Sequence, residues 1–300
     1  MGVARFIDDA GEPPGGTRTS TSKIAMSTPD TNNRRAVASR GLSGRSAIVT
    51  GSTSGIGLGI ARALAQAGAN VMLNGFGEPA SIGHLQEALE REHAVAVEYD
   101  DGNLTIPDAI ERMVSRARTS FGRVDILVNN AGIQHVAHIE EFPRDKWDAI
   151  VALNLTAVFH ATIAVFGNMK AQKFGRIINI ASCLGLVAAP FKSAYVAAKH
   201  GVVGLTKVTA LEGAEFNITA NAICPGFVWT PLVENQIQDL AKSHNIPRED
   251  VIRDILLAQQ PTKRFATVEE IAALAVFLAT DAAGSITGAA LTVDGGTTAH

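Results

Sequence analysis

Short β-branched runs alternate along residues 46–296 with longer stretches in which apolar residues recur every three or four positions. This alternation is typical of repeated βα units, in which helices cover both faces of a parallel sheet. The predicted strands are Ala47–Thr50, Asn70–Asn74, Ala94–Glu98, Val124–Asn129, Arg176–Ala181, Thr219–Ile223 and Ala290–Val293. The predicted helices are Gly55–Ala67, Ser81–Glu92, Pro107–Phe121, Trp147–Gln172, Ser193–Phe216 and Val268–Ala279. We therefore expect one doubly wound α/β domain over residues 45–300, with ligands at the carboxyl ends of its strands.

The composition narrows the possible partners and the compartment. With 46% hydrophobic residues and a net charge of -3, the chain can bury a core but has no strong field for nucleic acid. Only two cysteines occur, Cys183 and Cys224, and no metal-ligand spacing is present, so we expect a reducing compartment and no metal. Apolar stretches such as Ile271–Ala279 are about half of the roughly 20 residues that span a bilayer. We expect a soluble protein without a membrane partner.

Residues 1–44 are rich in Gly, Pro, Ser, Thr and Arg, which predicts a disordered extension. The extension lacks the apolar segment of a secretory signal, and the early acids Asp8, Asp9 and Glu12 disfavour a transit peptide without ruling it out. A translation start at Met26 is a further alternative. We expect a cytoplasmic protein, or one of the mitochondrial matrix if the extension is a transit peptide.

A glycine-rich turn follows the first predicted strand and opens the first predicted helix, from Thr50 to Gly57. Gly51 permits the tight turn, Gly55 lets the backbone approach a pyrophosphate, and Gly57 lets the helix pack closely on the sheet. A glycine-rich turn without a ligand is the alternative, but three glycines here each cost conformational entropy. The turn predicts a dinucleotide-binding, Rossmann-type domain.

The end of the second predicted strand bears on cofactor choice. The run from Asn74 to Gly77 contains neither the acid expected for a ribose hydroxyl nor an Arg for a 2′-phosphate, which favours NAD over NADP. Asn103 and Leu104 follow the third strand, where they could contact adenine. Asn130 and Gly132 follow the fourth strand, where we expect them to line the cofactor cleft.

Tyr195 and Lys199 are four residues apart on a predicted helix, so their side chains share one face. Free tyrosine has a pKa of about 10, and a nearby cation favours the phenolate, which would make Tyr195 a usable base. A lone Tyr-x-x-x-Lys pair is weak evidence. Here Ser182 lies at the end of the preceding strand, and Asn154 lies in the long helix before it.

Together with Asn129-Asn-Ala-Gly132 and Pro225-Gly226, these motifs resemble the short-chain dehydrogenase/reductase family over about residues 44–296. The resemblance implies that Tyr195 is the acid/base, Ser182 donates a hydrogen bond to the substrate oxygen, and Lys199 lowers the tyrosine pKa and holds the nicotinamide ribose. It implies that Asn154 holds a water of the proton relay. The cofactor contacts it implies are Thr50, Gly51, Ser54, Gly55, Ile56, Gly57, Phe76, Asn103, Leu104, Asn130, Gly132, Tyr195, Lys199, Pro225, Val228 and Thr230.

Longer stretches, among them Leu73-Asn-Gly-Phe-Gly77 and Lys192-Ser-Ala-Tyr-Val-Ala-Ala-Lys-His-Gly201, resemble the bacterial D-3-hydroxybutyrate dehydrogenases of that family. This implies reversible, NAD-dependent oxidation of D-3-hydroxybutyrate, or of a related small 3-hydroxy acid, to the 3-oxo acid. Ser182 and Tyr195 would meet the substrate hydroxyl, and Gln134, Lys192 and Gln236 would hold its carboxylate. The resemblance also implies a homotetramer.

Four positions depart from the pattern of those enzymes. Leu184 replaces a histidine, Phe227 and Thr297 replace tryptophans, and Trp229 stands where a polar residue is usual. The changes predict a less polar and roomier pocket. Two alternatives therefore stay open: an oxidoreductase of another carbonyl, such as a 3-oxoacyl thioester or a sugar, and a non-catalytic dinucleotide-binding regulator. We expect residues 227–260 to form a mobile helical lid over the cleft.

Overall fold

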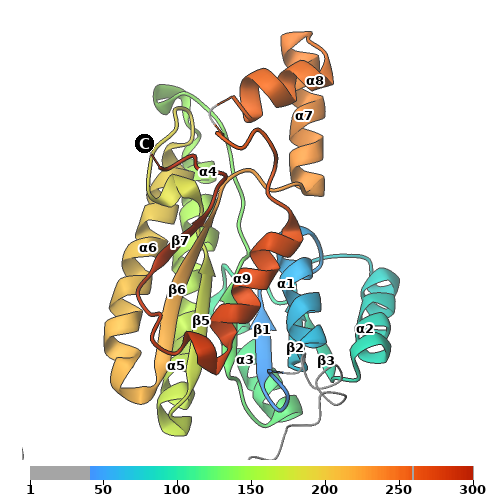
Figure 1. Ribbon diagram of the computed structural model, residues 1–300, viewed down its shortest axis with the longest axis vertical. Helices are drawn as coiled ribbons and strands as arrows, with labels where there is room; N and C mark the ends of the chain where they lie inside the picture. The colour runs from blue at the N-terminus through green and yellow to red at the C-terminus, as the bar shows by residue number, and fades with distance from the viewer. Residues whose placement is uncertain (1–40, 259, 300) are drawn as a thin grey trace, which may run out of the picture. The chain divides into compact units, whose positions relative to one another are not determined.

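A computed structural model describes the backbone of residues 41–258 and 260–299, and within these the side chains of all but residues 232, 239, 243 and 244. The described part contains one parallel seven-stranded sheet in the order β3-β2-β1-β4-β5-β6-β7 (Figure 1). Its strands are β1 Ser46–Val49, β2 Asn70–Asn74, β3 Val97–Asp100, β4 Ile126–Asn129, β5 Gly175–Ile180, β6 Ile218–Pro225 and β7 Ala290–Val293. The predicted doubly wound α/β fold is confirmed.

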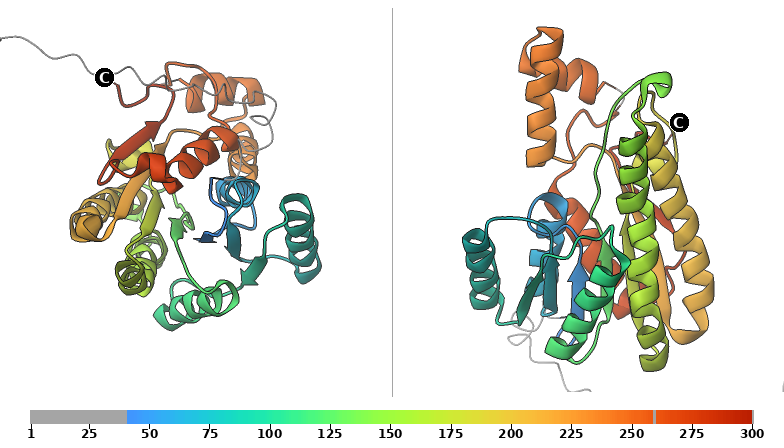
Figure 2. Two further views of the ribbon diagram at one scale, coloured as in Figure 1. Left: turned by 60° about the horizontal axis from the view of Figure 1, so that its bottom comes forward. Right: turned by 180° about the vertical axis from the view of Figure 1, so that it is seen from behind.

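Helices cover both faces of this sheet, as expected. They are α1 Gly55–Gln66, α2 Pro79–His93, α3 Pro107–Phe121, α4 Arg144–Val151, α5 Ala157–Gln172, α6 Ser193–Gly213, α7 Pro231–His244, α8 Arg248–Asp250 and α9 Val268–Ala279. Helices α1 and α9 pack together on one face, and α3, α5 and α6 lie side by side on the other (Figure 2). The central strands β1, β4 and β5 are buried throughout because both of their faces are covered.

Two predicted boundaries were wrong. The third strand was expected to begin at Ala94, but Ala94 has a left-handed backbone (φ 52°) and closes α2 by donating its N–H to the carbonyl of Glu90. The strand begins at Val97 instead. Leu42 was expected in the disordered extension, but it is buried in the core on the α1 and α9 face. The rest of the predicted extension, residues 1–40, lies outside the described residues.

The long helix before β5 runs from Arg144 to Gln172 through α4, a π-helical turn at Ala152–Thr156, and α5. It is long and apolar enough to cross a membrane by length and composition, with a mean hydropathy of 2.0 over its best window. Its apolar residues are interrupted by polar ones such as Asn154 and His160, so it is not one continuous apolar run. One such helix is weak evidence for a membrane span, and the inner face of α5, including Val165 and Met169, packs in the sheet core.

The segment between β6 and α9 stands beyond the carboxyl edge of the sheet (Figure 1, top). Helices α7 and α8 and a π-helical turn at Val251–Leu256 enclose a small apolar core of their own around Ile237 and Val251. A single β-bridge between Val228 and Ala266 joins the two stems of this segment. The predicted helical character of residues 227–260 agrees with the structure, and their mobility stays a prediction.

Candidate active site

The glycine turn joins β1 to α1 at the carboxyl edge of the sheet. Gly51 and Gly55 have left-handed backbones, with φ of 61° and 55°. A Cβ on Gly57 would lie 2.2 Å from the carbonyl oxygen of Gly51, so the helix can approach the turn only with glycine there. The N-cap residue Ser54 forms no side-chain cap hydrogen bond. The first amides of α1 are therefore available for a phosphate.

Buried polar side chains hold the turn in shape. The hydroxyl of Thr50 accepts hydrogen bonds from the backbone N–H groups of Asn130 (2.9 Å) and Ala131 (3.1 Å). The side-chain amide of Asn130 donates to the carbonyl oxygens of Thr50 and Gly51, each at 3.0 Å. Asn130 thus ties β4 to the glycine turn, and its amide is committed to the protein. Its expected contact with the cofactor stays a prediction.

Hydrogen bonds from a side chain to backbone carbonyl groups also shape the end of β2. Asn74 is buried, and its amide group donates to the carbonyl oxygens of Asp100 and Gly102, each at 3.1 Å. Phe76 lies 71% exposed two residues further on. Leu104 has its side chain in the core against α3, so only its backbone can face the cleft. Of the two residues expected to contact adenine, Asn103 is exposed and Leu104 is buried, and their contact with adenine stays a prediction.

The structure brings Ser182 and Tyr195 together, as expected. Ser182 follows β5, and its hydroxyl accepts the backbone N–H of Leu184 at 3.1 Å, which closes the turn after the strand. Tyr195 lies in the first turn of α6, near enough to Ser182 for the serine hydroxyl to act on the pKa of the phenol. Leu184, which replaces an expected histidine, therefore contributes its backbone to the site.

Lys199 lies one helical turn beyond Tyr195, and its position corrects one expectation. Its ammonium donates to the carbonyl oxygen of Ile180 at 2.8 Å and lies 5.6 Å from the centroid of the Tyr195 ring. Burial raises the pKa of Tyr195 to about 12, although the hydrogen bond from Ser182 opposes the shift. Burial also lowers the pKa of Lys199 to about 8. The expected lowering of the tyrosine pKa by Lys199 is absent from this form, because desolvation of the phenol dominates.

Asn154 sits in the π-helical turn and is fully buried. Its side-chain oxygen accepts the N–H of Ile133 and its amide donates to the carbonyl oxygen of Ile133, both at 2.9 Å. This two-point contact fixes the loop after β4, which includes Gly132. One donor and one lone pair of the side chain are therefore occupied, and the water relay at Asn154 stays a prediction.

The three residues expected at the substrate carboxylate lie on three separate segments. Gln134 is exposed on the loop after β4, Lys192 precedes α6, and Gln236 is half-buried on α7. Burial lowers the pKa of Lys192, whose ammonium lies 5.7 Å from the centroid of the Phe227 ring. Within the described part of the chain, the ammonium of Lys192 has no ion pair. It is a half-buried cation without an anion.

Sequence reasoning missed a contact that spans the lid. Arg248 at the start of α8 forms a bidentate ion pair with Glu234 on α7, and its guanidinium lies 5.6 Å from the centroid of a Trp229 ring. That ring packs edge-on against Phe265 at 5.1 Å. We name Arg248, Glu234 and Trp229 the lid latch. Their separation in sequence gave no signal, because only the helical packing of the lid brings them together.

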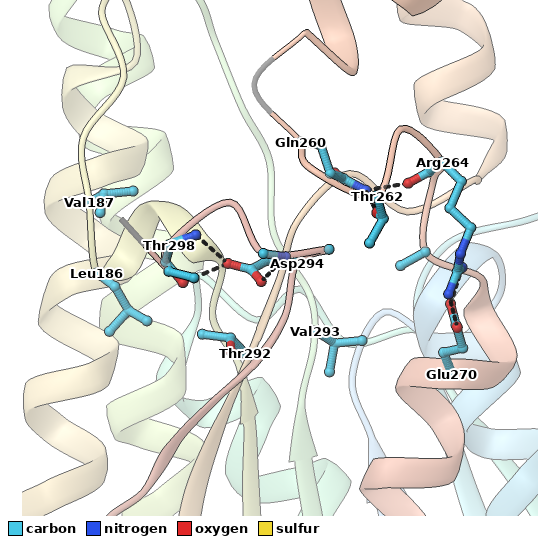
Figure 3. Close-up of a pocket in the computed structure, with 14 residues that line it drawn as sticks. Leu186, Val187, Gln260, Thr262, Arg264, Glu270, Thr292, Val293, Asp294 and Thr298 are labelled. Carbon is cyan, nitrogen blue, oxygen red and sulfur yellow. Dashed lines mark hydrogen bonds and ion pairs between the residues drawn. The ribbon is translucent and has the colours of Figure 1, made fainter.

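A cavity of about 680 Å³ opens at the carboxyl ends of β6 and β7 (Figure 3). Thr298 donates to the Asp294 carboxylate at one side of it, and Arg264 pairs with Glu270 at the other. Thr297, which replaces an expected tryptophan, turns its hydroxyl back to the carbonyl oxygen of Asp294 at 2.7 Å. The predicted catalytic residues Asn154, Ser182, Tyr195 and Lys199 are not among those that line this cavity.

A doubly wound sheet with a glycine turn after β1 and a Ser-Tyr-Lys group at its carboxyl edge is the arrangement of a dinucleotide-dependent oxidoreductase. Residues 51–298 match a family model described as Enoyl-(Acyl carrier protein) reductase. The chain belongs to the short-chain dehydrogenase/reductase family, and it is an enzyme of that family.

Curated relatives span nearly the same length. The chain is 52% identical over 256 residues, 85% of its length, to a D-beta-hydroxybutyrate dehydrogenase of Rhizobium meliloti, covering 99% of that protein. It is 52% identical over 255 residues to a D-beta-hydroxybutyrate dehydrogenase of Cupriavidus necator, with 85% of this chain and 98% of that protein covered. It is 39% identical over 258 residues to a putative ketoacyl reductase of the monensin polyketide synthase of Streptomyces virginiae, with 84% and 96% covered.

Proposed function

We propose that the enzyme oxidises D-3-hydroxybutyrate, or a related small 3-hydroxy acid, to the 3-oxo acid with NAD, and that the reaction is reversible. The observation that most supports this proposal is the environment of the Lys192 ammonium. A half-buried ammonium without an anionic partner in the described residues is costly unless a ligand supplies the negative charge. Lys192 precedes Tyr195 by three residues, so a small carboxylate bound there would bring its hydroxyl toward the phenol. The two relatives named D-beta-hydroxybutyrate dehydrogenase support the same substrate.

The proposed chemistry divides between the cofactor and the side chains. When bound, the cofactor supplies the hydride acceptor for the carbon that bears the substrate hydroxyl. Tyr195 accepts the hydroxyl proton, and Ser182 donates a hydrogen bond to the same oxygen as the carbonyl forms. A phenol with a pKa of about 12 is protonated at neutral pH, so in the reverse direction Tyr195 can donate its proton at once. Oxidation requires the phenolate to be stabilised by the charges gathered in the ternary complex.

The choice of NAD follows from the end of β2. The Asn74 amide is committed to backbone carbonyls, and residues 74–77 carry no cation that could pair with a 2′-phosphate. Thr53 donates to the carbonyl oxygen of Phe76 at 3.0 Å, which closes the turn toward the glycine loop. We therefore expect a lower KM for NAD than for NADP.

The assay is the NADH absorbance that appears with D-3-hydroxybutyrate, compared with L-3-hydroxybutyrate, longer 3-hydroxy acids, neutral alcohols and a 3-oxoacyl thioester in the reverse direction. The proposal expects the highest kcat/KM with a small D-3-hydroxy acid. A higher kcat/KM with the thioester would instead favour a ketoacyl reductase, the second candidate. Leu184, which is apolar where a histidine is usual, and Thr297, which is smaller than the usual tryptophan, favour that candidate. NAD binding without turnover of any compound would indicate a regulator.

We also propose a homotetramer. Phe159 and Ile163 on α5, and Val208 and Leu211 on α6, are large apolar side chains between 45% and 81% exposed. These helices lie side by side on one face of the sheet (Figure 2), where a second copy could cover both. Light scattering measures the state directly, and Leu211→Asp should lower the assembly mass. A cytoplasmic location remains our proposal, with the mitochondrial matrix as the alternative.

A further inference from the structure

Phe191, the residue before Lys192, has a left-handed backbone with φ of 67°. This conformation is strained for a bulky side chain, and the surrounding structure must hold it in place. Most other non-glycine residues with positive φ in the described chain close a helix, namely Ala94, Lys173, Asn217 and Asn245. Phe191 instead precedes one, since α6 begins at Ser193. Helix termination therefore does not explain its conformation.

Two contacts from a single loop hold Phe191. Its carbonyl oxygen accepts the N–H of Ala137 at 3.0 Å. Its ring packs edge-on against the imidazole of His138, with centroids 4.6 Å apart. The ring is 47% exposed, so burial in a core does not account for its place. The loop that supplies both contacts follows β4 and also carries Gln134.

The backbone at Phe191 decides where Lys192 points. Lys192 is the N-cap residue of α6, and its carbonyl oxygen accepts the N–H of Val196 at 2.9 Å. Its side chain does not cap the helix; the ammonium instead lies near the ring of Phe227, the first residue of the lid segment. A change of φ at Phe191 to negative values would redirect the chain just before the helix and move that ammonium.

We propose that Phe191 is a positioning residue whose left-handed backbone, clamped by Ala137 and His138, aims Lys192 into the substrate site. The same clamp ties Lys192 to the loop of Gln134, so two groups expected at the carboxylate keep a constant separation. The inference rests on the proposed function, because it assigns Phe191 to recognition of an anionic substrate. It adds a determinant of specificity outside the residues that would touch the substrate.

Two substitutions of Phe191 distinguish the effect of its backbone conformation from the effect of its ring. Phe191→Gly removes the whole side chain but accepts a positive φ, whereas Phe191→Val keeps an apolar side chain whose β-branch opposes it. We expect Phe191→Val to raise the KM for D-3-hydroxybutyrate roughly tenfold and Phe191→Gly roughly threefold, with KM for NAD unchanged. If the ring mattered only through apolar contact, Gly would be worse than Val, and that order would overturn the proposal. Phe277→Ala removes a similarly exposed ring on α9 and should change neither KM.

A double-mutant cycle tests whether Phe191 acts through Lys192. In a Lys192→Ala background, Phe191→Val should raise the KM no further, because the group it aims is gone. An undiminished effect in that background would refute the positioning role. Thermal midpoints of all variants check that the fold is retained.

Calorimetric binding of butyrate to the enzyme with NADH separates this inference from the proposed function. If butyrate binds and Phe191→Val weakens it more than Phe191→Gly, the positioning role stands even when 3-hydroxybutyrate is not oxidised. If the wild type binds no small carboxylate, both are wrong. If butyrate binds equally to all variants, only the positioning role is wrong.

Discussion

The two ends of the sheet's carboxyl edge are held by different kinds of contact. At the cofactor end, hydrogen bonds between Thr50 and Asn130 tie the glycine turn to the end of β4, and the Asn74 amide ties the end of β2 to that of β3. At the substrate end, the partly exposed ion pair of Arg248 and Glu234 joins α8 to α7 within the lid. Buried polar groups are costly to leave without partners, whereas exposed ion pairs contribute little. We therefore expect the cofactor end to be the more rigid of the two, and the lid to rearrange more readily.

The largest effect on kcat should come from substitution of Tyr195, the proposed reacting group between these two ends. Tyr195→Phe should lower kcat by roughly 10²- to 10⁴-fold, because it removes the proposed proton acceptor. The affinity for NAD should stay nearly unchanged, since the glycine turn is intact. Steady-state kinetics and fluorescence titration with NADH measure the two quantities. A variant with the wild-type rate would show that another group moves the proton.

A substitution that loosens the glycine turn at the cofactor end should lower both the affinity for NAD and the thermal stability. Asn130→Ala leaves the carbonyl oxygens of Thr50 and Gly51 without their side-chain donor, and we expect NAD to bind roughly tenfold more weakly. The thermal midpoint should fall as well. The control is Asn70→Ala at the amino end of β2, where the side chain accepts only the N–H of Ala96. Equal loss of NAD affinity in both variants would contradict a locked turn.

The lowered pKa of Lys199 leads us to expect that the free energy of unfolding depends on pH. Its pKa is lowered from 10.5 to about 8 in the folded protein, so between these values the unfolded chain binds more protons and the free energy of unfolding rises with pH. From pH 7 to pH 9 the rise should be about 1 kcal/mol from this group. Lys199→Met should lack that rise. Calorimetric scans at the two pH values measure it, and an identical increment in the variant would assign it to other groups.

A substitution in the lid should raise the KM for D-3-hydroxybutyrate. Gln236→Ala on α7 should raise the KM for D-3-hydroxybutyrate roughly fivefold through loss of one hydrogen bond to the carboxylate. The thermal midpoint should stay unchanged, because no described contact of Gln236 supports the fold. Steady-state kinetics with D-3-hydroxybutyrate provide the measurement. Unchanged KM and kcat would remove Gln236 from the site.

The lid latch should have the smallest effect. Glu234→Gln weakens the pair with Arg248 while keeping the shape of the side chain, and we expect a rise in KM of roughly twofold. High salt should produce a similar rise in the wild type and none in the variant. Initial rates at two ionic strengths test this. A salt response that persists in Glu234→Gln would place its origin elsewhere.

Much of the fold followed from hydrophobic periodicity, because parallel strands covered on both faces must be apolar throughout. The strand after α2 was misplaced because Ala94 is apolar and small, and nothing in the sequence marks its left-handed turn. The helix before β5 begins at Arg144 and not at the predicted Trp147, because its first turn is charged and carries no apolar periodicity.

The predicted site residues differ in how far the structure supports them. Ser182 and Tyr195 lie near one another as expected, because the end of β5 and the start of α6 meet at the same edge of the sheet. The direction of the tyrosine pKa could not be foreseen, since a charge four residues away is visible in the sequence but the depth of burial is not. The lid latch and the clamp at Phe191 were also invisible, because each joins segments separated along the chain.

The sequence by itself determined the doubly wound sheet, the glycine turn and the chemical groups of the site, because these depend on local periodicity and on short spacings. The tertiary structure alone decided the environment of those groups. It desolvates Tyr195 and Lys199, which raises the pKa of the phenol and lowers that of the ammonium, and it leaves Lys192 half-buried with no ion pair among the described residues. Desolvation and charge pairing depend on every segment that packs around a residue, and such packing is not encoded at any single position.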